Sequence, residues 1–105
     1  MTLAQIQALI VSVDENAGHY ESAYDESDAY TVWREISRVP FSADNEYAEE
    51  GWRFQVDRFT KSEGDVVAED MFAALNADER VYTTYAADYD PDTGYIRHSF
   101  ACVGL

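Results

Sequence analysis

The chain has 105 residues, of which 47% are hydrophobic and 14% aromatic, and this composition excludes a disordered chain and predicts a single folded domain over residues 1–105. Twenty-one acidic residues against seven basic ones give a net charge of -14 at pH 7. Nucleic-acid phosphates and anionic membranes repel so acidic a surface, which argues against a direct DNA-reading role. Solubility or a salt-rich host cytoplasm would also account for the charge.

The first predicted element is a helix that begins at Thr2 and ends near Asp14. Thr2 and Gln5 have the spacing of a capping box, in which each side chain satisfies a free backbone N–H of the first turn. Apolar residues then recur at intervals of three and four, the pattern of one buried helix face. These residues are Leu3, Ile6, Ile10 and Val13.

Residues 14–28 break this periodicity and carry six acids, so we expect an extended loop, with Tyr20 and Tyr24 as candidate anchors. Two strands follow, "AYTVWREISRVP" and "GWRFQVDRFT", in which side chains of different character alternate. Between them lies the acidic connection "FSADNEYAEE", which predicts a hairpin with a long tip.

The segment "KSEGDVVAEDMFAALNADER" predicts the second helix, with Ser62 or Asp65 as its N-cap and Asn76 or Asp78 near its end. Two further strands, "RVYTTYAADY" and "GYIRHSFACV", complete the chain. The order α-β-β-α-β-β predicts an α+β domain with one four-stranded, mostly antiparallel sheet and both helices on one of its faces.

The stretch "DYDPDTGY" resembles the start of a calcium loop because Asp88, Asp90 and Asp92 alternate before a glycine. Its central part, "DPDTG", links the last two strands. An EF-hand needs glycine at its sixth position and glutamate at its twelfth, where this chain has Thr93 and Ser99. Proline, aspartate and glycine in this order instead suit a type I turn with a bulge at the glycine. We therefore expect a hairpin turn and no metal site.

Catalytic motifs are missing from the sequence, so we expect no enzyme and no cofactor. Its single cysteine, Cys102, lies among apolar residues and is expected to be buried and inert. His98 lies in the middle of a predicted strand, where a structural or surface role is expected. Four residues along a strand span about 13 Å, so His98 and Cys102 are too far apart to form a catalytic pair.

Aromatic residues are numerous for so small a chain: eight Tyr, five Phe and two Trp. Sheet propensity accounts for part of this number. Two short helices cannot cover all of them, however, and Tyr and Trp on an open sheet face are typical of protein interfaces. The candidate interface aromatics are Tyr30, Trp33, Trp52, Tyr82 and Tyr85.

Three segments together resemble the siphophage tail-terminator and tail-completion proteins, a family that includes tail-to-head joining proteins. They are "YTVWREIS", then "WRFQVDRFTK" after an acidic hairpin tip, then a helix of the type "VVAEDMFAAL". The order of elements matches over nearly the whole chain, and the specific residues lie within about 30 to 75. The N-terminal helix and loop are shorter than the lead-in of many family members.

The resemblance implies a non-enzymatic virion protein in the tail or neck, made in the host cytoplasm. Its partners would be copies of itself in a ring, commonly hexameric, together with tail-tube and head-connector proteins. DNA would only pass through. The hairpin tip is the candidate assembly or lumen loop, through Asp44, Glu46, Tyr47, Glu49 and Glu50.

A second class of function fits the charge equally well. A small acidic protein can imitate DNA and inhibit a nucleic-acid-binding protein, for which acids at phosphate-like spacing on one face would be needed.

Overall fold

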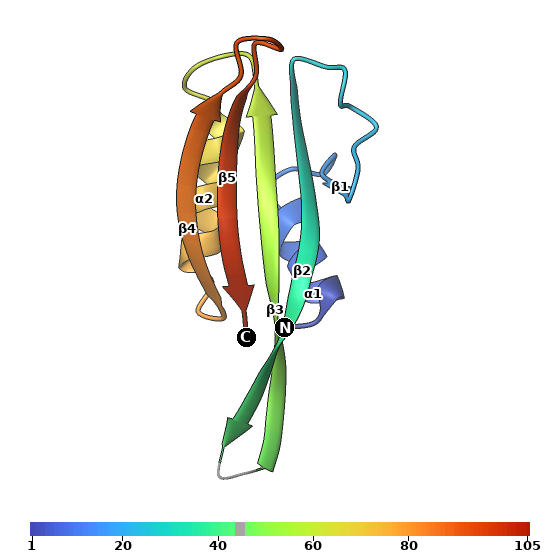
Figure 1. Cartoon of the computed structure of the whole chain (residues 1–105), viewed down its shortest axis with the longest axis vertical. Coiled ribbons are helices and arrows are strands. Elements are labelled where there is room, and N and C mark those ends of the chain that lie inside the picture. Colours follow the sequence, from blue (N-terminus) through green and yellow to red (C-terminus); the bar gives the residue numbers. More distant parts are fainter. Residues whose placement is uncertain (44–45) are drawn as a thin grey trace.

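The computed structural model describes the backbone of residues 1–43 and 46–105, and the side chains of residues 1–39 and 51–105 (Figure 1). Its elements are α1 (Leu3–Val11), β1 (Gly18–His19), β2 (Ala29–Ala43), β3 (Glu46–Thr60), α2 (Val66–Ala77), β4 (Val81–Tyr89) and β5 (Ile96–Gly104). The two helices and the four long strands follow one another in the predicted order. The α+β class is therefore confirmed.

The sheet has five strands in the order β1-β2-β3-β5-β4. β1 pairs with β2 in parallel, whereas the other neighbours are antiparallel. The four-stranded prediction missed β1, which lies inside the predicted loop. Gly18 and His19 pair with Val32 and Trp33, and Tyr20 then turns the chain away with φ 70°. Two residues are too few to show the alternation by which a strand is recognised in a sequence.

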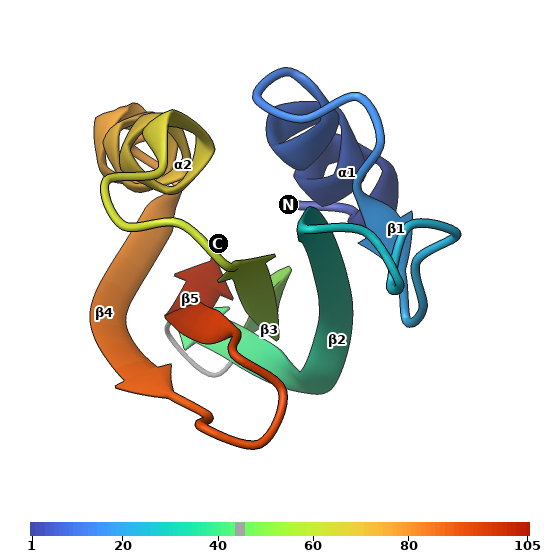
Figure 2. The same ribbon diagram turned by 90° about the horizontal axis from the view of Figure 1, so that it is seen from above.

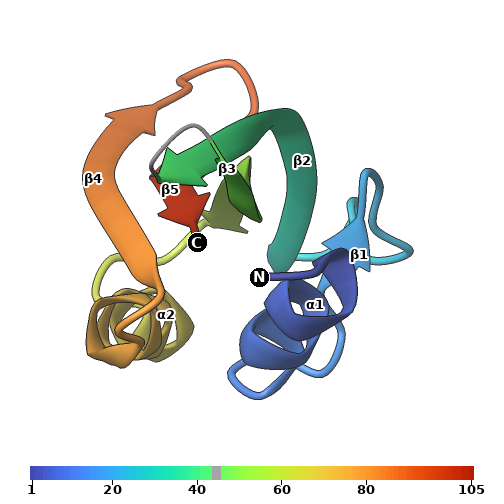
Figure 3. The ribbon, with the colours of Figure 1, turned by 90° about the horizontal axis from the view of Figure 1, so that it is seen from below.

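Both helices lie on the same, concave side of the curved sheet, as Figures 2 and 3 show from its two ends. α2 lies beside β4, and α1 lies on the side of β1 and β2. The core fills the space between helices and sheet, since burial of apolar surface drives the two layers together. It consists of Ile6, Ile10, Trp33, Phe54, Val56, Met71, Leu75, Val81, Phe100 and Cys102.

The N-caps predicted for the two helices are confirmed, but α1 does not end where it was predicted to end. Thr2 and Gln5 form the capping box of α1, and Asp65 accepts a hydrogen bond from the amide of Ala68 at 3.0 Å to cap α2. α1 ends at Val11, earlier than predicted. Asp14 lies beyond the end of the helix, and its carboxylate accepts a hydrogen bond from Arg58. Neither described helix has the length and apolar character needed to cross a membrane.

A buried charged network joins the layers around Arg58 on β3, whose exposed fraction is 7%. Its Nε and Nη2 donate to the two carboxylate oxygens of Asp65, at 2.8 and 3.3 Å. Its Nη1 donates to Asp14 and to the Thr31 hydroxyl, both at 3.3 Å. One guanidinium therefore connects the middle of the sheet to the start of α2 and to the chain that follows α1.

The turn between β4 and β5 is the predicted hairpin. Gly94 donates its amide hydrogen to the carbonyl of Asp90 at 2.8 Å and has φ 79°, a conformation that favours glycine. The side chain of Asp90 accepts a bond from the amide of Asp92. The carboxylate thus stabilises the turn itself.

The hairpin of β2 and β3 extends beyond the body (Figure 1). β5 pairs with β3 only from Trp52 to Thr60, so residues 39–43 and 46–51 continue as a two-stranded ribbon, called here the arm. The molecule measures 50 × 23 × 23 Å as a result. Within the described backbone, the two strands of the arm pair with each other and with no third strand.

Candidate assembly surface

The convex face of the sheet is covered by neither helix and is called here the open face. Pairing across β2, β3, β5 and β4 arranges its side chains in four rows. The rows are Ser37–Arg53–Val103–Tyr82, Arg34–Gln55–Ala101–Thr84, Val32–Asp57–Ser99–Ala86 and Tyr30–Phe59–Arg97–Asp88. Small, polar and charged side chains fill the two middle rows, and the aromatic residues Tyr82, Tyr30 and Phe59 lie in the two outer rows.

Charge is distributed unevenly over this protein. Among the described side chains of its four rows, the open face holds three basic residues, Arg34, Arg53 and Arg97, and two acids, Asp57 and Asp88. One arginine is already paired, because Arg97 Nε donates to Asp88 at 3.1 Å. The open face is thus slightly basic on a strongly acidic molecule.

The carboxylate of Asp57 forms hydrogen bonds with neighbouring side chains of the open face. Its carboxylate accepts hydrogen bonds from the Gln55 amide at 3.0 Å and from the Ser99 hydroxyl at 2.9 Å. It is therefore oriented by neutral neighbours, and no described arginine forms an ion pair with it.

Arg34 and Arg53 form a basic spot on the open face. Arg34 lies opposite Gln55, and Arg53 lies two residues before Gln55 on β3, so the two arginines are diagonal neighbours. In a sheet such positions are about 7–8 Å apart. Both are exposed, and within the described side chains neither forms an ion pair.

The exposed side of this spot is bordered by apolar groups. Tyr82 is 73% exposed and pairs with Val103, which is itself the neighbour of Arg53 across the sheet. Ile36, at a register shift between Glu35 and Ser37, is 51% exposed. The basic spot therefore lies between two exposed apolar side chains.

The far end of the open face is an aromatic cluster. Tyr30 stacks on Phe59 with ring centres 4.7 Å apart, and Tyr95 meets both rings edge-on. The hydroxyl of Tyr95 donates to the carbonyl of Ser27 at 2.5 Å, and Lys61 lies over its ring. Burial raises the pKa of Tyr30. This cluster also fixes the long loop before β2 to the sheet.

The five predicted interface aromatics do not share one face. Tyr30 and Tyr82 lie on the open face, whereas Trp33, Trp52 and Tyr85 lie on the helix side. For Trp33 the interface prediction is wrong, because it is 1% exposed and part of the core, with its ring stacked on His19 at 4.0 Å. β1 and α1 together cover it.

Trp52 and Tyr85 are each partly exposed on the helix side of the sheet. Trp52 is half-buried against the core, and the guanidinium of Arg38 lies 4.8 Å from its ring centre. Tyr85 is 47% exposed and its ring contacts Phe72 and Phe100. Both are reachable only from the helix side, so they cannot act together with Tyr82.

The predicted assembly loop, Asp44, Glu46, Tyr47, Glu49 and Glu50, lies outside the residues whose side chains the structure describes. The described backbone places Glu46, Glu49 and Glu50 on β3, within the arm.

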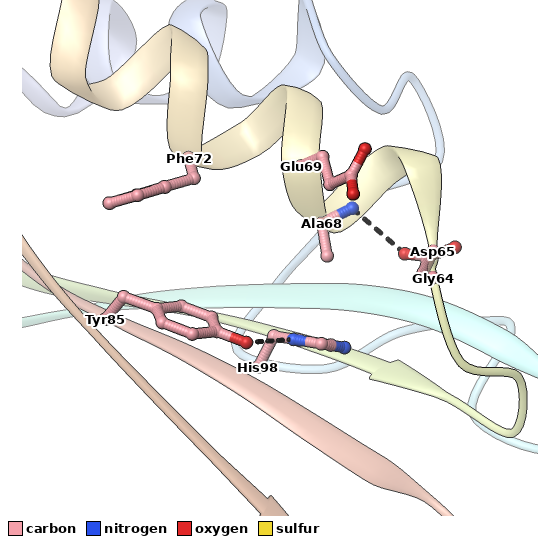
Figure 4. Close-up of a pocket in the computed structure, with 7 residues that line it drawn as sticks. All are labelled: Gly64, Asp65, Ala68, Glu69, Phe72, Tyr85 and His98. Carbon is pink, nitrogen blue, oxygen red and sulfur yellow. Dashed lines mark hydrogen bonds between the residues drawn. The ribbon is translucent and has the colours of Figure 1, made fainter.

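A cavity of about 280 Å³ opens between the first turns of α2 and strands β4 and β5 (Figure 4). Its lining consists of Gly64, Asp65, Ala68, Glu69, Phe72, Tyr85 and His98. The Tyr85 hydroxyl and His98 Nδ1 lie 2.7 Å apart, and Nε2 of the same imidazole is buried without a hydrogen-bond partner. His98 therefore lies on β5, as predicted, and lines this cavity.

The titratable side chains that line this cavity are Asp65, Glu69, Tyr85 and His98. It contains no cysteine, serine or threonine to act as nucleophile beside the imidazole. Among the described residues no three His, Cys, Asp or Glu side chains gather as metal ligands. Cys102 is buried elsewhere in the core, and burial raises the pKa of its thiol to about 11.

No protein-family model matches the chain, and no curated protein sequence matches it.

Proposed function

We propose that this chain is a non-enzymatic structural subunit of a phage particle, which assembles with copies of itself into a ring that caps the tail tube and joins it to the head connector. The resemblance of residues 30 to 75 to tail-terminator and tail-completion proteins suggests this role. The observation that carries the proposal is the combination of an open sheet face with an arm that leaves the body.

These two surfaces are different parts of one subunit. A contact between the arm of one copy and the face of the next is therefore heterologous, and heterologous contacts repeated with the right rotation close into a ring. Exposed strands support the same reading, since β4 has a neighbour on one side only. Burial of the arm against another subunit would supply the support that an isolated ribbon lacks.

The overall charge supports passage of DNA through such a ring. A net charge of -14 repels phosphate, and at 0.1 M salt this repulsion acts over about 10 Å. DNA would then slide through a narrow channel without adhering to its wall.

Imitation of DNA is the other class compatible with this charge, and the open face does not favour it. A DNA mimic gathers acids on the surface that meets its basic partner. The described rows of the open face instead hold three arginines, Arg34, Arg53 and Arg97, against two acids, Asp57 and Asp88.

Electron microscopy of the purified chain in negative stain tests the proposal. We expect annular particles with a central opening, built from about six subunits as the resemblance implies. Particles of monomer size at all protein concentrations, together with a tight salt-sensitive complex with a basic DNA-binding protein, would refute the ring and favour the mimic.

A further inference from the structure

We propose that the free edge of β4 binds an extended segment of a partner protein, which adds to the sheet as a further strand and carries basic side chains and alternating apolar ones. The site consists of the β4 edge at residues 83–89 and of the cavities between this part of the strand and the start of α2. It belongs to the single subunit, and the inference holds whether or not the chain forms a ring.

The backbone groups of β4 alternate in direction. In an antiparallel pair, every second residue exchanges N–H and C=O bonds with the neighbouring strand, and the residues between them point the other way. At one end of the β4–β5 pairing the Leu105 amide donates to the Arg80 carbonyl at 2.8 Å. At the other end the Asp90 amide donates to the Tyr95 carbonyl at 2.9 Å. Even-numbered residues therefore bond to β5, and the odd-numbered ones direct N–H and C=O to the free edge. From residue 83 on these are Thr83, Tyr85, Ala87 and Tyr89.

This edge is long and uncovered. β4 lies at one border of the sheet, with β5 as its neighbour (Figure 1), and residues 84–89 are all exposed. Proteins usually protect such an edge with lysine, proline or a bulge, but the nine residues of β4 include neither lysine nor proline and pair with β5 in unbroken register. At the opposite border, β1 is only two residues long. The β4 edge is thus the border of the sheet that is suited to pair with another strand.

Cavities lie beside this edge on the helix side of the sheet. The odd-numbered side chains of β4 lie on that side, as the ring contacts of Tyr85 with Phe72 and Phe100 show. The cavity of Figure 4 borders Tyr85. A second cavity, of about 520 Å³, follows along β4, and its lining includes Ala87, Tyr89 and Ile96. Every second side chain of an added strand would face these cavities. Main-chain hydrogen bonds then supply affinity, and pockets for alternate side chains supply specificity.

Charge around the cavities decides the kind of partner. Their described lining holds four acids and one lysine: Glu63, Asp65, Glu69, Asp88 and Lys61. Asp65 is already paired with Arg58, whereas Glu63 and Glu69 are exposed. Lysine or arginine on the added strand would form charge-assisted hydrogen bonds with these exposed carboxylates. A second β4 edge would instead bring the same acids against one another, so the partner is a basic segment of another protein.

The probe is a set of three fluorescent nine-residue peptides, with valine, leucine or phenylalanine at alternate positions and lysine or threonine between them. We expect at least one peptide to bind in fluorescence anisotropy, and its version with glutamate in place of lysine to bind more weakly, on the order of tenfold. Methylation of one alternate set of its amide nitrogens should abolish binding, and methylation of the other set should not, because only every second residue bonds to β4. Failure of all three peptides, or equal binding of the two methylated forms, would overturn the inference.

Variants of the chain locate the site. Ala87→Pro removes an amide that points to the free edge and retains the bonds to β5, so it should weaken peptide binding about tenfold. Tyr89→Ala removes a side chain that is 63% exposed beside the second cavity, and should weaken binding to a similar extent without the backbone change. The control Tyr24→Ala removes a side chain that is 48% exposed in the loop before β2, and should bind like the wild-type chain.

Circular dichroism checks that each variant is folded. Equal peptide binding by the wild-type chain, Ala87→Pro and Tyr89→Ala would contradict the assigned site. Loss of self-association in Ala87→Pro, with no peptide bound by the wild-type chain, would show that the edge pairs with a second copy and would overturn the partner segment.

Discussion

Arg58 Nε donates to the Asp65 carboxylate at 2.8 Å, and this buried pair joins strand β3 to the residue that caps α2. The same guanidinium reaches Asp14 beyond α1, so a single side chain connects both helices to the sheet. The helix layer is thereby fixed to the concave side, and the open face remains available to other molecules. The contacts that hold the helices therefore lie on the side of the sheet opposite the open face.

Replacing Arg58 by alanine should destabilise the fold by about 3–5 kcal/mol, because the carboxylates of Asp65 and Asp14 would remain half-buried without their cation. Urea denaturation followed by circular dichroism measures this loss. Arg80→Ala is the control, since it removes an exposed arginine paired with Asp78 and should change stability little. Equal stability of the two variants would contradict the role given to Arg58.

The acid sensitivity of the fold should depend on Asp65. Burial alone would raise the pKa of this carboxyl, but hydrogen bonds from Arg58 and from the Ala68 amide, with the positive charge of Arg58, lower it below its ordinary 3.8. The ionised form therefore contributes stability that is present above about pH 3.8 and is lost as the pH falls through the lower folded-state pKa.

The variant Asp65→Asn retains a good helix cap but lacks the charge. The gap in free energy of unfolding between wild type and variant should be large at pH 7 and should narrow below the pKa of Asp65. Chemical denaturation at a series of pH values measures it. A gap that does not vary with pH would contradict the ionised pair.

The thiol of Cys102 should be unreactive in the folded protein. It is 4% exposed, and burial raises its pKa to about 11, so the reactive thiolate is scarce at neutral pH. We expect Ellman's reagent to label Cys102 rapidly in urea and very slowly in native buffer. Rapid labelling without denaturant would show that the packing of β5 against the helices is open.

Trp33 and Tyr82 should separate stability from assembly. Trp33→Ala removes a core side chain that is 1% exposed and should cost about 3–5 kcal/mol of stability. Tyr82→Ala alters a side chain that is 73% exposed and should change stability by no more than about 0.5 kcal/mol, while weakening self-association. Thermal unfolding and sizing chromatography of both variants make the comparison. If Trp33→Ala lost self-association but kept its stability, the core position given to Trp33 would be contradicted.

Alternation along β3 was sufficient to predict which of its residues share a face, whereas on β2 the register shift between Glu35 and Ser37 interrupts the alternation. It placed Arg53, Gln55 and Asp57 opposite Phe54 and Val56, and the structure agrees. The capping box at Thr2 and the turn at Gly94 also follow from local chemistry, which acts over a few residues and is visible in the sequence.

Contacts between distant segments could not be predicted in this way. Strand β1 exists because Gly18 and His19 pair with a strand that begins about ten residues later, and no pattern within two residues indicates it. Its presence is also what buries Trp33 against His19, so the error at Trp33 follows from the missing strand. The basic spot was missed because Arg34 and Arg53 become neighbours only in the β2–β3 register.

The central claim is self-assembly, and light scattering on a sizing column at several protein concentrations tests it most directly. We predict a mass of about six subunits of 11.9 kDa, or a mass that rises toward that value with concentration. A mass of one subunit at every concentration would contradict the account.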